Sequence, residues 1–248
     1  MANSYAALSR HYDLIMTSGY YDYGAYARAL VTELGDHKRV LELGVGTGLV
    51  CESLLELSGA DLRLTGIDHT ESMLAQARAR LGNRVQLIRQ DIVEMAAPPV
   101  FDAAFSVGGI WYGTQAPEGG ELCSHLLKED DDIRALKNVC AAIRPGGPLL
   151  LAVQQAHRNY QRPLPGGLVY AQEIRPEGDR FVKDYFVRKA GEVVAHQRCE
   201  FRAYPQDRAD RLLAQCGFHF ERATEDGLLR RYAREAATPR PQRTHPPR

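Results

Sequence analysis

The sequence predicts an α/β protein built on a doubly wound sheet. A buried strand at 39–43 runs into the glycine turn Gly44-Val45-Gly46-Thr47-Gly48, which opens a helix. Strand and helix patterns then alternate up to residue 154, as they do in parallel sheets with right-handed crossovers. The chain has 248 residues, which is enough for one such domain with a well-buried core.

Hydrophobic periodicity and turn residues give the elements in order. Two helices are expected ahead of the first strand, at 2–10 and 23–34. The alternating part should comprise strands at 39–43, 62–67, 85–89, 101–107 and 149–154 and helices at 47–57, 71–81 and 131–143. Arg144-Pro145-Gly146-Gly147 is a typical end for the last of these helices.

The pattern changes after residue 155. Segments 168–174, 181–188 and 193–202 alternate apolar and polar residues and are separated by glycine-containing turns, which predicts an antiparallel meander. A helix at 207–216 and a hairpin of 218–224 with 228–234 should follow. Residues 237–248 are rich in Pro and Arg, and we expect them to be a disordered tail.

The glycine turn indicates a ligand site. Glycines at alternate positions leave bare backbone for a ligand to contact, and the following helix presents free N–H groups. A dinucleotide fingerprint requires a small residue where this chain has Leu49. Glu42 would also repel a pyrophosphate. An acid there suits a positively charged ligand such as S-adenosylmethionine, which carries a sulfonium and an ammonium and no phosphate.

On these residues, region 40–151 resembles the class I S-adenosylmethionine-dependent methyltransferases, and a looser likeness reaches about residue 235. The resemblance implies a Rossmann-like seven-stranded sheet whose last strand is antiparallel, with the meander as a β insertion at about 166–203. It divides the chain into a helical lid at 1–36, a methyltransferase domain at 37–236 and the tail. The meander resembles that of small-molecule N- and O-methyltransferases of bacterial secondary metabolism, including the amino-sugar N-methyltransferases.

Ligands of open α/β sheets bind at the carboxyl ends of the strands. Asp68 ends the second strand about twenty residues beyond the glycines, where an acid can bind ribose hydroxyls. The resemblance implies that Asp91 and Ile92 contact adenine and that Met73 lies on its face. The expected cofactor-binding residues are Glu42, Gly44, Gly46, Gly48, Asp68, Met73, Asp91, Ile92 and Ser106. Alternatively, the two aspartates could cap turns and Met73 could be a core residue.

The acceptor side is expected to be aromatic, because tyrosine and tryptophan rings can stack on a planar acceptor or surround a cationic amine. Several tyrosines lie in the proposed lid, and Trp111 follows the fourth strand on a glycine-flanked loop. The expected substrate-binding residues are Tyr5, Tyr12, Tyr20, Trp111, Tyr112 and Tyr170. Packing of these rings in the core is the alternative.

The catalytic chemistry is less specified. The fourth strand ends in Ser106-Val107-Gly108-Gly109. It therefore lacks the Asn/Asp-Pro-Pro-Tyr/Phe signature of amino-group methyltransferases that act on nucleic acid or glutamine. No pair of acidic residues suggests a magnesium-dependent enzyme. His125 and Tyr12 are the candidate catalytic residues, although an amine delivered neutral needs no base. Methylation of nitrogen is slightly favoured over oxygen. A nicotinamide-dependent oxidoreductase and a non-catalytic adenosyl-ligand-binding module stay as alternatives.

Composition limits the partners. The 31 Lys and Arg balance the 31 Asp and Glu, whereas nucleic-acid binders usually show a basic excess. No apolar run approaches the length of a membrane span, and no signal peptide is evident. Five cysteines without a Cys-x-x-Cys pair favour a cytoplasmic protein with reduced thiols and no metal site. Either a second copy of the chain or the rim of the substrate pocket could cover the apolar face of the meander, and we favour the homodimer.

Overall fold

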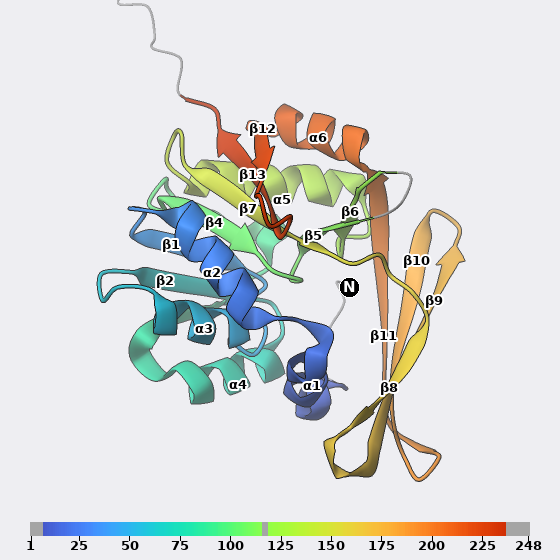
Figure 1. Cartoon of the computed structure of the whole chain (residues 1–248). Helices are drawn as coiled ribbons and strands as arrows, with labels where there is room; N and C mark the ends of the chain where they lie inside the picture. The colour runs from blue at the N-terminus through green and yellow to red at the C-terminus, as the bar shows by residue number, and fades with distance from the viewer. Residues whose placement is uncertain (1–6, 116–118, 237–248) are drawn as a thin grey trace, which may run out of the picture.

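The computed structural model describes residues 7–115 and 119–236, and it shows a mixed sheet with helices on both faces (Figure 1). Its central strands are parallel and follow the order β3-β2-β1-β4-β7. These strands are β1 (Arg39–Leu43), β2 (Arg63–Asp68), β3 (Val85–Arg89), β4 (Ala103–Ser106) and β7 (Pro148–Gln154). The expected α/β Rossmann-like architecture is confirmed.

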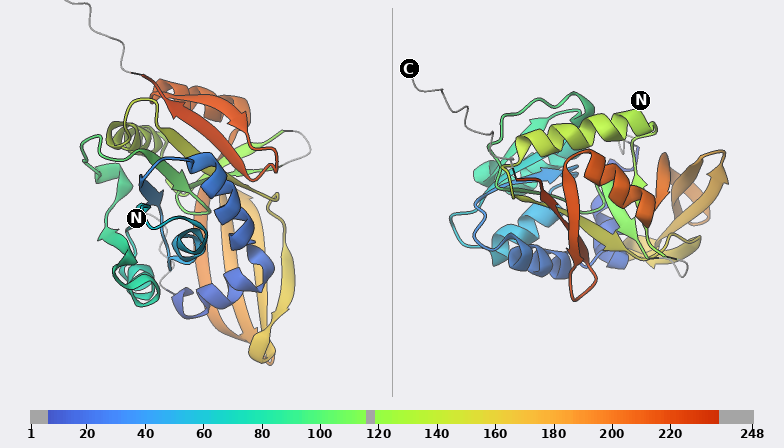
Figure 2. Two further views of the ribbon diagram at one scale, coloured as in Figure 1. Left: turned by 60° about the vertical axis from the view of Figure 1, so that its left-hand side comes forward. Right: turned by 90° about the horizontal axis from the view of Figure 1, so that it is seen from above.

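Helices cover the two faces of this sheet because successive strand residues point to opposite sides. The helices α2 (Tyr23–Leu34), α3 (Leu49–Leu57) and α4 (Glu71–Leu81) pack on one face, and α5 (Glu129–Ala142) and α6 (Gln206–Gln215) pack on the other (Figure 2). On β7, for example, Leu150 packs with the first group and Leu149 and Leu151 with the second.

The sheet extends further than expected. On one side of β7 lies β13 (Leu229–Arg234), which runs antiparallel to β7 and to β12 (Phe218–Ala223). On its other side, beyond the end of β4, lies β5 (Trp111–Thr114), followed by β6 (Glu121–Ser124). The sequence predicted a loop for β5. The strand forms because Gly113 and Thr114 pair with the last residues of β7, a contact that local sequence does not reveal.

Through β6 the sheet continues into the meander, whose long strand β11 (Glu192–Pro205) pairs with it. The other strands of the meander are β10 (Arg180–Lys189), β9 (Leu168–Glu177) and β8 (Tyr160–Leu164). The last of these was not predicted. It contains Pro163, which is tolerated because β8 lies at the edge of the sheet.

The N-terminal segment covers the meander. It forms α1 (Ser9–Ile15) and the π-helical turn η1 (Met16–Tyr20), so the helix continues past the end expected at residue 10 and includes Tyr12. Residues 2–6 of the expected helix lie outside the described residues. Ile15 and Met16 pack against Tyr185 and Val187 of β10. This apolar face of the meander is therefore buried within the chain, without a second copy.

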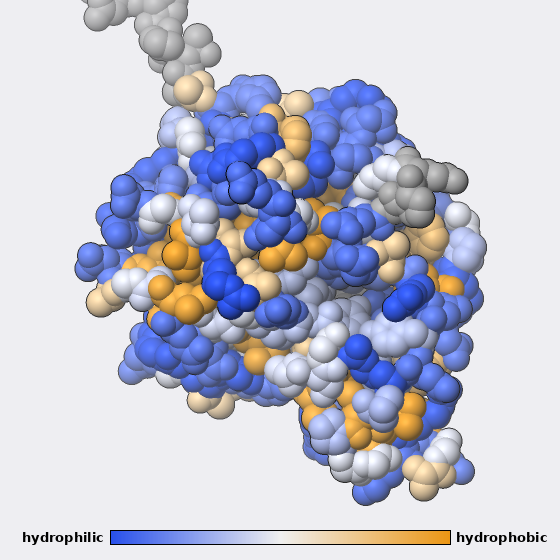
Figure 3. Space-filling view, in the orientation of Figure 1, coloured by the Kyte–Doolittle hydropathy of each residue, from blue (hydrophilic) through white to orange (hydrophobic). Residues whose placement is uncertain are grey.

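Three short helical turns complete the described structure, namely η2 (Gly82–Arg84), η3 (Ile92–Glu94) and η4 (Pro165–Gly167). No helix among residues 7–115 and 119–236 is long and apolar enough to cross a membrane. The face seen in Figure 3 is mostly hydrophilic, with hydrophobic residues in separate patches. Tyr5 and the tail at 237–248 lie outside the described residues.

Candidate functional site

The glycine turn is fixed to the end of the neighbouring strand. The N–H groups of Gly44 and Val45 each donate to the carbonyl of Ile67 at 2.9 Å, and Gly46 N donates to Asp68 Oδ2 at 3.0 Å. Gly44 has a φ of +77°, and a Cβ there would lie 2.8 Å from Gly109 Cα. A side chain is excluded at this position because two backbone segments, after β1 and after β4, meet there.

The turn forms one wall of a cleft at the carboxyl ends of β1 to β4. The cleft is lined by Tyr12, Gly44, Gly46, Ile67, Asp68, His69, Thr70, Met73, Gln90, Asp91, Ile92, Gly108, Gly109, Ile110, His125 and Leu126. Asp68 also accepts from Thr70 N at 2.8 Å, and Asp91 accepts from Val93 N at 2.9 Å. Each carboxylate oxygen has two lone pairs, so both aspartates keep capacity for a ligand.

A second space, the inner cavity, adjoins the cleft. It is lined by Tyr12, Met16, Tyr20, Tyr21, Gly108, Tyr112, His125, Gln154, His157, Lys183 and Tyr185. Tyr12, Gly108 and His125 belong to both spaces. The walls of the inner cavity come from η1, the strand ends of the main sheet and the meander strand β10.

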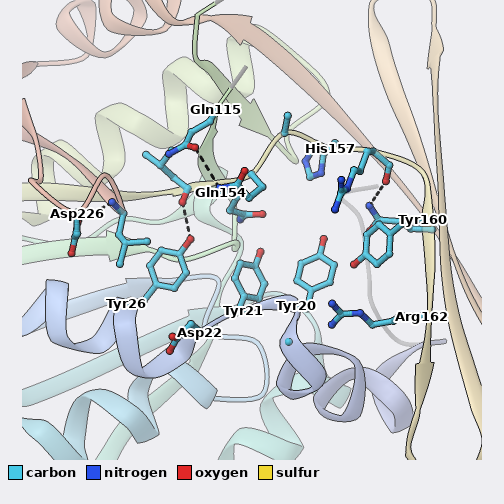
Figure 4. Close-up of a pocket in the computed structure, with 17 residues that line it drawn as sticks. Tyr20, Tyr21, Asp22, Tyr26, Gln115, Gln154, His157, Tyr160, Arg162 and Asp226 are labelled. Carbon is cyan, nitrogen blue, oxygen red and sulfur yellow. Dashed lines mark hydrogen bonds between the residues drawn. The ribbon is translucent and has the colours of Figure 1, made fainter. Parts of the chain in front are cut away.

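An outer cavity of about 400 Å³ lies beyond the inner one. The two share Tyr20, Tyr21, Gln154 and His157, which are labelled among the residues that line the outer cavity in Figure 4. The cleft, the inner cavity and the outer cavity thus adjoin one another in sequence, starting at the glycine turn.

Comparison with known proteins decides the family. Residues 40–147, from the glycine strand to the end of α5 and its following turn, match the family described as a methyltransferase domain. The chain contains a methyltransferase domain. The putative methyltransferase YqeM of Bacillus subtilis is 23% identical over 243 residues, which cover 90% of this chain and 89% of that protein.

Solved structures share the fold of this methyltransferase. The sugar N-methyltransferase KedS8 from Streptoalloteichus gives a TM-score of 0.68 at 19% identity and covers 90% of this chain and 92% of that one. CalS10, an amino pentose methyltransferase from Micromonospora echinaspora, gives 0.63 at 20% identity, with coverage of 87% and 92%. S-adenosylmethionine is the cofactor that the sequence predicts for this cleft.

The residues of the cleft fit that cofactor. Gly46 faces Met73, because a Cβ at Gly46 would be in van der Waals contact with Met73 Cε at 3.7 Å. Asp68 and Asp91 lie in the same cleft as this turn, as expected for contacts to ribose and adenine. Gly44, Ile92 and Met73 also line it.

The other three expected cofactor residues lie behind the cleft wall. Gly48, with a φ of +84°, packs against Leu81. Ser106 is buried and donates to the carbonyl of Leu43 at 3.2 Å. Glu42 is 1% exposed and accepts a hydrogen bond from Cys51 Sγ at 2.8 Å. Burial raises the pKa of Glu42 to about 8, so this acid is neutral near pH 7 unless a cation binds nearby.

Two expected substrate residues do not reach the cavities. Trp111 is in β5 rather than in a loop, is 1% exposed, and donates from Nε1 to Asp132 Oδ1 at 2.7 Å. Its indole belongs to the core beside α5, because the strand points it away from the cleft. Tyr170 is buried behind Tyr20 and Tyr185, and its hydroxyl donates to Gln172. We therefore leave both out of the proposed substrate site.

The remaining candidates meet at the junction of cleft and inner cavity. His125 lines both spaces, and Tyr12 faces it from α1. Burial lowers the pKa of His125 to about 4 and raises that of Tyr12, so both are neutral at pH 7. Tyr112 hydrogen-bonds to His157 Nε2 at 2.8 Å in the wall of the inner cavity.

Sequence reasoning missed Lys183 and Gln154. Lys183 lies on the inward side of β10 with Tyr185 and Val187, so a cation interrupts an otherwise apolar face at alternate positions. That break in the pattern could have marked Lys183 as a functional residue. No feature of the sequence marks Gln154, at the end of β7, in the same way. Within the described part of the chain, no group of three or more His, Cys, Asp or Glu side chains could hold a metal ion.

Proposed function

We propose that this methyltransferase transfers a methyl group from S-adenosylmethionine to a nitrogen or oxygen of a small-molecule acceptor held in the inner cavity. When bound, the cofactor supplies an electrophilic methyl group. The observation that carries the proposal is the direct junction of cleft and inner cavity at Tyr12, Gly108 and His125. An enclosed space at this point suits a small molecule better than a polymer.

The names of the structural neighbours favour nitrogen as the methylated atom. KedS8 is a sugar N-methyltransferase and CalS10 an amino pentose methyltransferase. At about one fifth identity they support this choice only as analogues of fold. The formal net charge of zero gives no support for a nucleic-acid acceptor.

The N-terminal segment acts as the lid in this proposal. The free volume of the inner cavity is about 10 Å³, roughly the space of one water. An acceptor can enter only when α1 and η1 move away from β10. Asp13 links α1 to the cofactor turn, because it accepts a hydrogen bond from Thr47 Oγ1 at 2.6 Å and pairs with Arg80. Cofactor binding at the turn would thereby favour the closed lid.

Label transfer tests the proposal. The chain is incubated with methyl-labelled S-adenosylmethionine and pools of amino sugars, aliphatic amines, phenols and nitrogen heterocycles, and products are identified by mass spectrometry. We expect labelled small molecules from at least one pool and no label on RNA or protein. Cofactor binding without transfer to any pool would favour the non-catalytic binding module.

A further inference from the structure

The side chain of Lys183 reaches from β10 into the wall of the inner cavity although it scarcely meets solvent. The residue is 2% exposed, and its Nζ donates to the hydroxyl of Tyr20 at 2.6 Å. The same Nζ lies 4.8 Å from the centroid of the Tyr185 ring. Two aromatic side chains thus hold an amine at the place where the proposed acceptor binds.

No carboxylate faces this amine among the described residues that line the inner cavity. The titratable groups around it are the phenols of Tyr20 and Tyr185, the thiols of Cys123 and Cys199, and the imidazoles of His125 and His157. Burial lowers the pKa of Lys183 to about 7. Burial and the neighbouring Lys183 lower the pKa of both histidines. Near neutral pH, Lys183 can therefore lose its proton and accept another.

Gln154 gives a second and independent indication of a ligand at this position. It is 9% exposed and lines both the inner and the outer cavity. Its Nε2 lies close to Gly108 but has no hydrogen-bond partner in the described structure. Buried amide groups without a partner are rare, because their desolvation is not offset. A ligand oxygen or deprotonated nitrogen in the inner cavity would supply the missing acceptor.

We infer that the acceptor reacts through a weakly acidic O–H or N–H, as in a phenol or an acidic ring nitrogen, that Lys183 removes this proton, and that Gln154 hydrogen-bonds to the resulting anion. The inference rests on the proposed function and specifies the substrate class of the same site. A protonated aliphatic amine would instead meet Lys183 with no carboxylate in the described wall to balance its charge.

The step balances in atoms and charge. The acceptor gives its proton to the neutral amine of Lys183 and keeps the electron pair of the broken O–H or N–H bond. That pair forms the bond to the methyl carbon as the carbon–sulfur bond breaks, and the electrons of that bond stay on the sulfur of S-adenosylhomocysteine. The positive charge of the sulfonium reappears on Lys183, which releases the proton to solvent.

4-Nitrophenol is the probe for the test, because its phenolate absorbs visible light and its phenol does not. It is titrated with base in the presence of the full chain and S-adenosylhomocysteine. We expect the bound probe to ionise at a pH about one unit or more below that of the free probe, which means at least a tenfold preference for the anion. Lys183→Met should abolish the shift, whereas Gln154→Leu should weaken binding severalfold and retain it.

Lys189→Met is the matched control, since this exposed lysine ends the same strand, and it should leave shift and affinity unchanged. The inference is overturned if the probe does not bind, if it binds as the phenol, or if the shift survives Lys183→Met. If Lys183→Met does not fold, two results still test the inference. They are the lowered ionisation pH of the probe bound to the unmodified chain, and the same lowering in Gln154→Leu. Label transfer to an aliphatic amine without phenolate binding would overturn this inference alone, whereas absence of all transfer would overturn the proposed function.

Discussion

Glu42 shows how a single buried acid links pH to stability. The unfolded carboxyl ionises around its usual pKa of 4.5, whereas the folded one holds its proton up to about pH 8. The folded state therefore loses stability as pH rises through this window. We expect Glu42→Gln to be more stable than the unmodified chain by on the order of 2 kcal/mol at about pH 9, with little difference at about pH 4. Thermal melts at both pH values measure this, and an equal difference at both would refute the buried-acid interpretation.

Lys183 should show the opposite trend. Its folded pKa of about 7 lies below the usual 10.5, so stability is lost as pH falls through the folded pKa. Lys183→Met should raise the melting temperature at about pH 6, and the gain should shrink toward about pH 10. A gain that does not depend on pH would mean that the lysine is charged and solvated in the folded state.

Asp68 is the residue most directly tied to cofactor affinity. Asp68→Ala removes a carboxylate from the cleft and should weaken binding of S-adenosylmethionine by about 1.5–3 kcal/mol, as for a lost hydrogen bond to a charged group. The control is Asp61→Ala, which removes an exposed acid just before β2. Unchanged affinity in Asp68→Ala would place the ligand elsewhere.

The sequence predicts the position of some site residues and not of others. Asp68 and Asp91 could be assigned because each directly follows a strand, and parallel strands end at one edge. Lys183 and Gln154 meet only because β10 folds back over the end of β7 through β11, β6 and β5, a path that spans distant segments. Local patterns carry no information about such a meeting.

At the scale of elements, the turn after β4 controls the border between cleft and inner cavity. Gly108 has a φ of +68°, and a Cβ there would clash with the Tyr21 hydroxyl. Gly108→Ala should displace Tyr21 and reduce methyl transfer at least tenfold. Gly178→Ala is the matched control, with a φ of +67° and no atom within 4 Å of its Cβ position, so it carries the strain without the clash. Equal losses in both variants would mean that backbone strain alone is responsible.

The elements themselves were predicted where periodicity is regular. The five central strands and their helices lie close to the expected ranges, because each has its own apolar pattern. β5, β6 and β8 were missed because four or five residues beside glycines or prolines resemble loops until another strand pairs with them. The end of the first helix was placed too early by several residues, because α1 continues to Ile15.

For the whole molecule, we expect the lid to close when cofactor product and acceptor are both bound. Amides of α1 and η1 should exchange hydrogen more slowly when S-adenosylhomocysteine and 4-nitrophenol are both bound, because these helices seal the inner cavity. The amides of α5, on the far face of the sheet, serve as the internal reference. Equal protection of α1 with and without the two ligands would count against a lid.

The homodimer stays a proposal, but the apolar face of the meander no longer supports it. The apolar face of the meander packs on α1 and η1, so a second copy would have to use another surface, such as the edge strand β8. Light scattering at tens of micromolar protein measures whether the chain is a monomer or a dimer. A monomer would leave roofing of the inner cavity as the role of the meander.

Calorimetric titration of the unmodified chain with S-adenosylmethionine, and separately with NAD, tests the central claim that the glycine turn and the strand-end acids form a cofactor cleft for a charged adenosyl ligand. We expect S-adenosylmethionine to bind in the micromolar range, at about −8 kcal/mol, and NAD to show no measurable binding. Tight binding of NAD without binding of S-adenosylmethionine would contradict it.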